Sequence, residues 1–564
     1  MRPTQATNHA HTLETPFGSL KGIKQEDGGG RPVLYRFLKI PFAQPPVGPL
    51  RWRRPKRLPS DFTFNSPSGE PGDYTRFGPI SPQPRYEHGL AYLPNPNAAP
   101  PIDNVQDEDC LYLNIWVPAS SPSPDGGWPV QVYLHGGWLQ VGDACQKHEF
   151  DPFDLLREGT PRIIVSPTYR LNLFGFLGGK SLASIKEEPA PGNYGFWDQR
   201  CALEWIAKYI PAFGGNPNNI SVGGLSAGAN SAFYQLYYDT HLPKSKRIIK
   251  RIYLWSNAVA IQPSRTASEP LTDQFYELCS IFGVSSKEEP QEQLDKLRAV
   301  LFRDLINAIP KLQRHTFRAT TDNDFIPATF LSSLLSGAFT TRLHDNGVSI
   351  MMGEVSDEKE LYKLVNPPDS LSTLHIQLEN YYPKIVCDAL LPLYPVPKPG
   401  SADDKPGTYA ELYAQIVADG QVHVSHRGFA HLLLNPPKSA DVRAMPSENV
   451  HRYRISWRAK GLDDWLKPEV GVCHAADMPI WMASGWRQDF SESDKEITKK
   501  FLEPFGKFLY GEKVEWGSSG GENRILWLDQ DGKIHRDYED PLWNRGMEVW
   551  NAMIAAQKEH LEIV

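Results

Sequence analysis

The chain has 564 residues, of which 40% are hydrophobic and 11% aromatic, as is usual for a folded globular protein. This composition excludes a disordered chain, and the length favours two or more domains or one large domain with insertions. With 59 basic and 66 acidic side chains, the net charge of −7 indicates no cationic surface for nucleic acid or for an anionic membrane. We expect the partner to be a small, largely neutral molecule.

The hydropathy of the chain and the pattern of its cysteines indicate its cellular compartment. No apolar run reaches the roughly 18–20 residues that a membrane-spanning helix needs. Residues 1–18 hold one arginine and no apolar stretch, which is not the pattern of a secretory signal. The six cysteines form no C-x-x-C pair and are expected to be free, buried thiols. We therefore expect a cytoplasmic protein.

Short apolar or β-branched runs alternate with helical patterns along the chain. Six runs predict strands, at 129–137, 162–170, 219–224, 251–258, 348–354 and 451–457. Several are almost continuously apolar, which is typical of parallel strands covered on both faces. Residues 198–213 carry apolar residues at helical spacing after an acidic start and predict a helix. This alternation predicts an α/β fold with a large, mostly parallel central sheet and helices on both faces.

Three stretches interrupt the alternation. Residues 54–108 are rich in proline, glycine and asparagine and predict a long ordered loop region, whereas 265–345 and 360–447 are mainly helical, for example at 287–309. Such insertions usually lie over the carboxyl edge of the sheet, where α/β proteins keep their sites. We therefore expect a flexible N-terminus over 1–13 and one domain over 14–564, in which the three stretches form a cap or lid.

The main chemical signal is Gly224-Leu225-Ser226-Ala227-Gly228, a G-x-S-x-G between a predicted strand and a helical pattern. A serine on a sharp strand-to-helix turn exposes its Oγ, and glycine on either side leaves room for the backbone. The following helix presents N–H groups to a developing oxyanion. Because the chain is rich in glycine and serine, the pentapeptide also arises by chance, so its surroundings must decide.

Two longer segments decide in favour of a nucleophile. FGGNPNNISVGGLSAG (213–228) and EDCLYLNIWVP (108–118) resemble the two signatures of the type-B carboxylesterases, the family of cholinesterases, liver carboxylesterases and some fungal lipases. The resemblance extends to 37–52, 169–178 and 192–206, and it is dense from residue 14 to 258 and sparser beyond. It implies the α/β-hydrolase fold, in a chain whose character is closest to cytoplasmic fungal members.

The resemblance also implies a catalytic triad in the chain order serine, acid, histidine. His474 lies in GVCHAAD (471–477), which resembles the family's G-x-x-H-x-x-D/E setting, and is the implied base. The family pattern G-x-x-x-D-E implies Glu358 as the acid, with the neighbouring Asp357 as the alternative. Without the resemblance, SDEKE would indicate a solvated loop and His474 a loop histidine without a catalytic role.

An oxyanion hole is implied by VYLHGGWLQVGD (132–143), which corresponds to the family's H-G-G-G loop. By position the implied backbone N–H donors are Gly137, Trp138 and Ala227. Trp138 replaces the third glycine and is expected to crowd either the acyl or the alcohol pocket.

Two further differences from the family pattern affect the expected rate of hydrolysis and the expected substrate. Leu225 stands where many relatives carry glutamate, which removes a favourable charge near the imidazolium. No tryptophan occurs from 53 to 115, where cholinesterases carry their platform for cationic ligands, so choline esters are not expected.

These features predict a carboxylesterase without cofactor or metal that hydrolyses a small to medium, mostly apolar ester through an acyl-enzyme. Acyl transfer to an alcohol or amine is an alternative, because it shares the acyl-enzyme. A non-catalytic binding protein is another, but such relatives typically lose the nucleophile and this chain retains all three triad candidates. A triacylglycerol lipase is less expected, because no long apolar lid surface is evident.

Overall fold

The computed structural model describes residues 6–84, 105–119, 123–145, 150–185, 192–258, 261–364, 367–464, 466–487, 490–516 and 521–561. Its strands are β1 (Thr7–Thr15), β2 (Gly18–Glu26), β3 (Pro32–Pro41), β4 (Gly72–Asp73), β5 (Tyr112–Pro118), β6 (Trp128–Leu134), β7 (Ile163–Pro167), β8 (Gly215–Leu225), β9 (Ile249–Trp255), β10 (Ser349–Val355), β11 (Val450–Ile455), β12 (Arg524–Leu528) and β13 (Ile534–Glu539).

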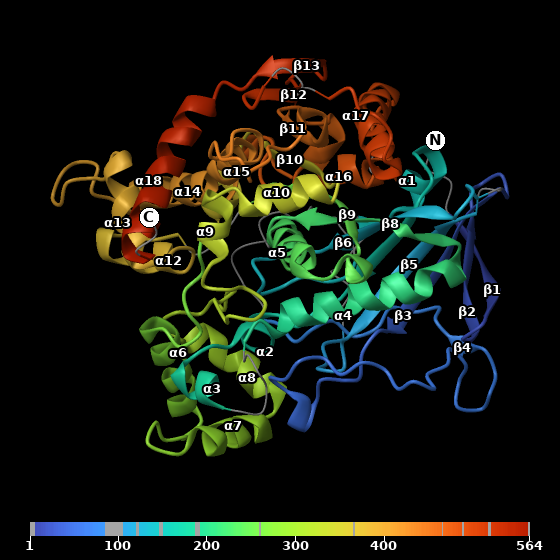
Figure 1. Cartoon of the computed structure of the whole chain (residues 1–564), viewed down its shortest axis with the longest axis horizontal. Coiled ribbons are helices and arrows are strands. Elements are labelled where there is room, and N and C mark those ends of the chain that lie inside the picture. Colours follow the sequence, from blue (N-terminus) through green and yellow to red (C-terminus); the bar gives the residue numbers. More distant parts are fainter. Residues whose placement is uncertain are drawn as a thin grey trace.

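These strands form one sheet in the order β1-β2-β3-β5-β7-β6-β8-β9-β10-β11-β12-β13, with β4 beside β2 (Figure 1). The pairs from β7 to β12 in this order are parallel, and antiparallel strands lie at both ends. The prediction of a mostly parallel central sheet is confirmed. All six predicted strands form, as β6 to β11, although their ends differ from the expected ones by a few residues.

The ends of the sheet differ from the expectation. Residues 7–13, expected to be flexible, belong to β1, which pairs with β2 along its whole length. β1 is largely exposed, so its sequence lacks the apolar alternation that marks a half-buried strand. The hairpin of β12 and β13 closes the other end, and β13 is also mostly exposed.

Helices cover both faces of the sheet. Those outside the two large insertions are α1 (Phe153–Glu158), α2 (Asn172–Phe176), α3 (Lys180–Ser184), α4 (Tyr194–Tyr209), α5 (Ala227–His241), α16 (Met478–Trp481), α17 (Glu492–Tyr510) and α18 (Trp543–Leu561). The predicted helix at 198–213 corresponds to α4 and the 3-10 turn Ile210–Phe213 that follows it.

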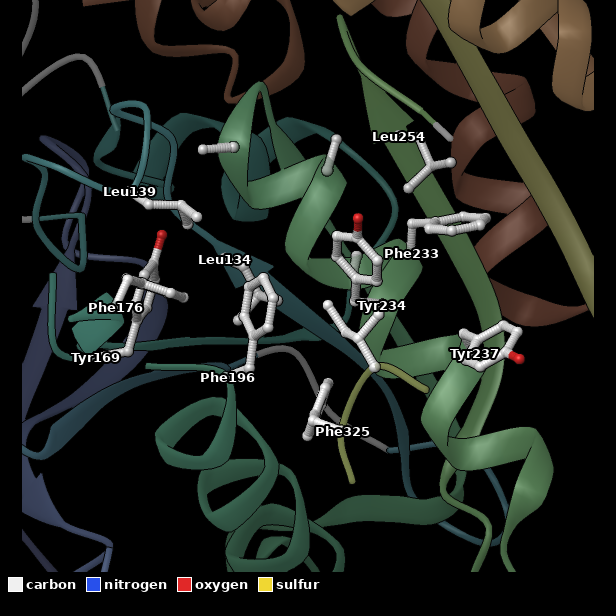
Figure 2. Close-up of a cluster of buried hydrophobic side chains, with 14 of the residues drawn as sticks. Leu134, Leu139, Tyr169, Phe176, Phe196, Phe233, Tyr234, Tyr237, Leu254 and Phe325 are labelled. Carbon is white, nitrogen blue, oxygen red and sulfur yellow. The ribbon is translucent and has the colours of Figure 1, made fainter. Parts of the chain in front are cut away.

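The two faces carry separate apolar cores, because successive strand residues point to opposite sides. On β9, Ile252 and Leu254 belong to the core under α4 and α5, whereas Tyr253 and Trp255 belong to the core under α16 and α17. Figure 2 shows the first core, where aromatic side chains of α5 such as Phe233 lie among residues of neighbouring segments. The central strands are therefore held rigidly from both sides.

Helices occur in both stretches that are expected to be mainly helical, 265–345 and 360–447. Between β9 and β10 lie α6 (Glu269–Ile281), α7 (Pro290–Ala299), α8 (Phe302–Ala308), α9 (Phe330–Leu335) and α10 (Ala338–Asp345), and between β10 and β11 lie α11 (Lys359–Tyr362), α12 (Leu371–Glu379), α13 (Lys384–Leu390), α14 (Pro406–Ala418) and α15 (Val424–Leu434). Among the described helices, none is long and apolar enough to cross a membrane.

The helical pattern at 287–309 is interrupted between α7 and α8, where Val300 and Leu301 are extended. The guanidinium of Arg51 donates to the carbonyl oxygens of Leu297, Arg298 and Val300. A helix end leaves such carbonyls without partners, so a cationic side chain from a distant segment stabilises the break.

Candidate active site

Ser226 lies on the tight turn between β8 and α5. Its φ of 57° and ψ of −122° are unfavourable for a residue with a Cβ, and its N–H donates to the Trp255 carbonyl oxygen at 2.8 Å. A Cβ on Gly224 or on Gly228 would lie 2.0 or 1.9 Å from the carbonyl oxygen of Leu134. The two glycines of the motif are therefore required by the close approach of β6, and the turn has the form expected of a nucleophile elbow.

His474 and Glu358 meet although 116 residues separate them. His474 Nδ1 lies 2.5 Å from Glu358 Oε2, and the two residues are 4% and 0% exposed. The N–H of Val355 donates to the other carboxylate oxygen at 3.0 Å. Burial alone would raise the pKa of Glu358, but attraction to His474 and their hydrogen bond bring it below its ordinary value. The carboxylate is thus kept ionised against the imidazole.

The other imidazole nitrogen, Nε2 of His474, is buried and has no hydrogen-bond partner in the described part of the chain. It is therefore not bonded to Ser226 Oγ in this structure. Catalytic hydrogen bonds of this kind often become short only when substrate is bound. An imidazole fixed through Nδ1 with Nε2 free is poised to accept a proton.

Asp357, the alternative acid, has a different partner. Its Oδ2 accepts from the Val472 N–H at 2.9 Å and from Ser356 Oγ at 3.0 Å, and its own N–H donates to the Val472 carbonyl oxygen. A Cβ on Gly471 would lie 2.4 Å from that carboxylate oxygen. Asp357 therefore anchors the loop that carries His474, while Glu358 contacts the imidazole itself.

The glycine loop after β6 lies against the elbow, since a Cβ on Gly136 would be 3.3 Å from the Ser226 Cβ. Gly137 and Trp138 have positive φ values of 109° and 58°, which turn the backbone sharply. Their amides and that of Ala227 donate to no acceptor within the described residues. All three predicted oxyanion donors are thus free to serve a ligand.

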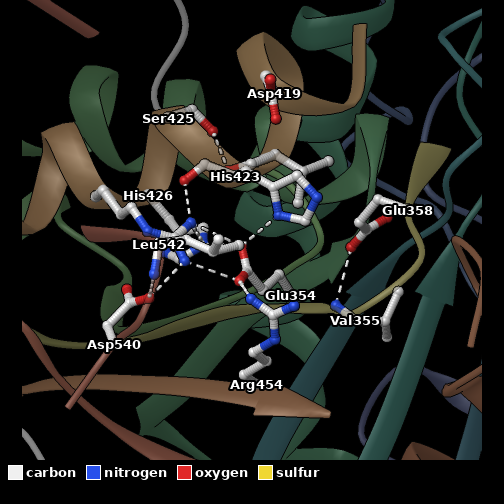
Figure 3. A network of polar contacts seen from close by, with 12 residues as sticks. Glu354, Val355, Glu358, Asp419, His423, Ser425, His426, Arg454, Asp540 and Leu542 are labelled. Carbon is white, nitrogen blue, oxygen red and sulfur yellow. Dashed lines mark hydrogen bonds and ion pairs between the residues drawn. The ribbon is translucent and has the colours of Figure 1, made fainter. Parts of the chain in front are cut away.

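The sequence analysis missed a buried charge network four residues before the acid (Figure 3). Glu354 Oε2 lies 2.6 Å from His423 Nδ1, 2.7 Å from His426 Nε2 and 2.8 Å from an Arg427 nitrogen. Arg427 also bonds Asp540, which precedes α18. The spacing of the two histidines and the arginine, i, i+3 and i+4, places them on one helix face and could have indicated the network.

Known proteins resemble this chain along most of its length. A model of the carboxylesterase family matches residues 9–563. An uncharacterized esterase/lipase of Schizosaccharomyces pombe (strain 972) is 41% identical over 542 residues, covering 95% of this chain and 96% of that protein. A carboxylic ester hydrolase of Gibberella moniliformis is 35% identical over 543 residues, covering 95% and 94%.

A bacterial relative and a solved structure extend the comparison. The para-nitrobenzyl esterase of Bacillus subtilis is 30% identical over 396 residues, covering 68% of this chain and 70% of that protein. A solved PNB esterase superposes with a TM-score of 0.69 at 23% identity, covering 96% of this chain and 99% of that one. The superposition shows that the two chains share the α/β-hydrolase fold.

Proposed function

Since this chain belongs to the carboxylesterase family and is a carboxylesterase, we propose that it hydrolyses small to medium, mostly apolar esters with Ser226, His474 and Glu358 as its triad. The observation that carries the proposal is the buried pair of His474 and Glu358, 2.5 Å apart, in which the second imidazole nitrogen has no hydrogen-bond partner among the described residues. A buried histidine fixed in this way is the expected partner of a serine on an elbow.

The reaction proceeds in two steps, acylation of Ser226 and hydrolysis of the acyl-enzyme. Ser226 Oγ attacks the ester carbonyl carbon while its proton passes to His474 Nε2, and Glu358 stabilises the imidazolium through Nδ1–H. The tetrahedral intermediate collapses, the C–O bond to the alcohol breaks, and the alkoxide takes the proton from Nε2. Water then attacks the acyl-enzyme carbonyl carbon while its proton passes to Nε2. The second tetrahedral intermediate collapses, the bond between the acyl carbon and Ser226 Oγ breaks, and Oγ takes the proton from Nε2, which releases the acid and restores the enzyme.

The negative oxygen of each tetrahedral intermediate is bound by the N–H groups of Gly137, Trp138 and Ala227. Within the part of the chain that the structure describes, these three N–H groups have no other acceptor, which supports this role. Donors that already point at the developing charge need no reorganisation during the reaction, and one such donor is worth roughly 100–1,000-fold in rate.

The indole of Trp138 restricts the substrate. It is partly buried against the core under α4 and α5, and its Nε1 is buried without a partner in the described chain. A ring of this size beside the oxyanion donors leaves space for short or unbranched groups, which supports a small to medium, mostly apolar ester.

We also propose a cytoplasmic location. The cysteines are all free and buried, which suits a reducing compartment; they are Cys110, Cys145, Cys201, Cys279, Cys387 and Cys473.

Active-site labelling tests the mechanism. A fluorophosphonate should modify Ser226 and abolish hydrolysis of p-nitrophenyl esters, and Ser226→Ala should be neither labelled nor active. Peptide mapping that finds the label on another serine, with Ser226→Ala still active, would overturn the proposal. A series of p-nitrophenyl esters of increasing acyl length then measures the preferred size.

A further inference from the structure

The loop that carries two of the proposed oxyanion donors, residues 135–142, contains two strained residues in succession. Trp138 and Leu139 have φ values of 58° and 66°, in the left-handed region that residues with a Cβ rarely adopt. Backbone of this kind persists only where surrounding contacts hold it. The oxyanion loop, as we call residues 135–142, therefore needs contacts that keep it in this conformation.

The main chain of Gln140 helps to direct the Trp138 N–H. The N–H groups of Gln140 and Val141 both donate to the Gly137 carbonyl oxygen, at 2.8 and 3.0 Å. That carbonyl belongs to the same peptide group as the Trp138 N–H, and in a trans peptide the two point in opposite directions. The turn therefore directs the Trp138 N–H away from residues 140 and 141, and no described residue accepts from it.

The side chain of Gln140 holds the next peptide group. It is 1% exposed, and its Nε2 donates to the Trp138 carbonyl oxygen at 3.0 Å. The same amide is anchored on Phe317, which lies 177 residues further along the chain: Nε2 donates to the Phe317 carbonyl oxygen at 2.6 Å and Oε1 accepts from the Phe317 N–H at 3.0 Å. Gln140 thus bonds the backbone on both sides of Trp138 and ties it to the first helical insertion.

The segment around Phe317 is itself firmly held. Residues 315–320 form neither helix nor strand, yet buried side-chain amides fix their main chain. Asn193 bonds both the N–H and the carbonyl oxygen of Thr320, at 2.9 and 2.7 Å, and Gln274 on α6 donates to the Thr316 carbonyl oxygen at 3.0 Å. Because both amides are buried, water does not compete for these bonds. The segment therefore gives Gln140 a rigid support.

We propose that Gln140 is a positioning residue of the ester site: its side chain ties the oxyanion loop to the segment around Phe317 and so keeps the Trp138 N–H directed at the developing oxyanion. The inference rests on the proposed role of that N–H as an oxyanion donor. Such donors act fully only when they already point at the charge, so a loop that shifts slightly loses part of their effect. Gln140 acts through Trp138 and does not itself contact the substrate.

Gln140→Met tests this role, because methionine has a similar length but no amide. With p-nitrophenyl acetate we expect kcat to fall at least about tenfold while KM changes less than about threefold, since the oxyanion exists only after attack. Rates are normalised to the Ser226 that a fluorophosphonate labels, so unfolded protein does not lower kcat. Gln140→Asn, whose amide is too short to bridge Trp138 and Phe317, gives the same test if Gln140→Met does not fold.

A transition-state analogue separates positioning from a general loss of structure. The probe is 1,1,1-trifluorohexan-2-one, which adds to a serine Oγ and forms a tetrahedral adduct with a negatively charged oxygen. Its inhibition constant therefore reports on the oxyanion donors. In Gln140→Met this constant should rise by about the same factor by which kcat/KM falls.

Gln293→Met is the matched control. Gln293 on α7 is also 1% exposed, and its Nε2 donates to the carbonyl oxygens of Ser285 and Glu288 at 3.0 and 3.1 Å. Within the described chain it bonds neither the oxyanion loop nor residues 315–320. Both variants should lower the midpoint of urea unfolding, but only Gln140→Met should lower kcat and weaken inhibition by the trifluoromethyl ketone.

An unchanged kcat in Gln140→Met, with Ser226 fully labelled, would overturn the proposal. Equal losses of kcat in Gln140→Met and Gln293→Met would also overturn it, because they would show a general effect of destabilisation. A loss confined to KM would overturn it by placing Gln140 in the substrate pocket. Labelling of another serine in the unmodified chain would refute the proposed function and with it this inference, and that outcome is seen before any Gln140 variant is measured.

Discussion

At the residue scale, two adjacent carboxylates at the end of β10 have separate tasks. Glu358 contacts the imidazole of His474, whereas Asp357 holds the N–H of Val472 two residues before that histidine. This difference follows from their separate hydrogen-bond partners. It yields a test that distinguishes a catalytic from a positioning carboxylate.

Glu358→Gln should lower kcat by roughly 10⁴-fold, because a neutral amide neither fixes the tautomer of His474 nor stabilises its cation. Asp357→Asn should cost less than about tenfold, since the amide oxygen still accepts from Val472 N–H. Steady-state kinetics on a p-nitrophenyl ester measures both. If the larger loss falls on Asp357→Asn, the assignment of the acid must move to Asp357.

Trp138 is the second residue that permits a direct test. Because its φ is 58°, Trp138→Gly fits the backbone, keeps the N–H donor and removes the indole. The ratio of kcat/KM for benzoyl over acetyl esters should rise. Each additional methylene that the opened space buries should lower the activation free energy by up to about 0.8 kcal/mol. An unchanged ratio would place the ring outside the acyl pocket, and a uniform loss on all esters would mean that it mainly supports the loop.

The candidate site residues could be named from the sequence, whereas the contacts around them could not. Ser226, His474 and Glu358 stand in motifs whose order along the chain is informative. The anchoring of the His474 loop by Asp357 depends on a contact across 115 residues, and no local pattern encodes it. The same holds for the hydrogen bond from Ser226 N–H to Trp255, which follows from the register of β8 against β9.

At the scale of elements, the elbow depends on how closely β6 approaches the start of α5. Gly228→Ala would put a Cβ 1.9 Å from the Leu134 carbonyl oxygen, which is backbone and cannot easily move. We expect a loss of about 1–3 kcal/mol in the free energy of unfolding, together with a lower kcat because Ser226 shifts.

The matched control is Gly407→Ala, in the first turn of α14, where a Cβ meets no atom within 4 Å. This change should leave kcat unchanged and stabilise the protein by roughly 0.4–1 kcal/mol, because alanine loses less backbone freedom on folding. Urea unfolding measures both variants. If Gly228→Ala behaves as Gly407→Ala does, the close packing of the elbow on β6 is refuted.

Strands were predicted correctly from the sequence where both faces of the sheet are buried. The six predicted strands lie in the parallel part of the sheet, where nearly every residue is buried and the apolar run is continuous. β1 and β13 are exposed and carry no such run, so their pairing is determined by neighbouring strands. The break between α7 and α8 depends on Arg51, which is distant in sequence.

At the scale of the whole molecule, buried histidines make stability depend on pH. His451 on β11 lies between the rings of Phe508 and Trp516, and burial lowers its pKa from 6.5 to about 4. Below pH 6.5 the unfolded chain takes up a proton at this residue, whereas the folded chain does so only near pH 4. The free energy of unfolding therefore falls as the pH falls through this window.

His431 has the opposite sign and serves as a control. Its hydrogen bond to Glu522 raises its pKa, so its contribution to stability is present below the unfolded pKa and is lost as the pH rises through the folded pKa. His451→Leu should therefore flatten the decline of stability between pH 6.5 and pH 4 by up to about 3 kcal/mol. His431→Gln should leave the slope in that window unchanged and should remove only the part of the stability that is lost as the pH rises above 6.5. Urea unfolding at half-unit pH intervals gives the three curves. Parallel curves for His451→Leu and the unmodified chain would mean that His451 titrates normally in the folded protein. The acid sensitivity would then have to come from other buried groups such as His426, because burial also lowers the pKa of His426 to about 4.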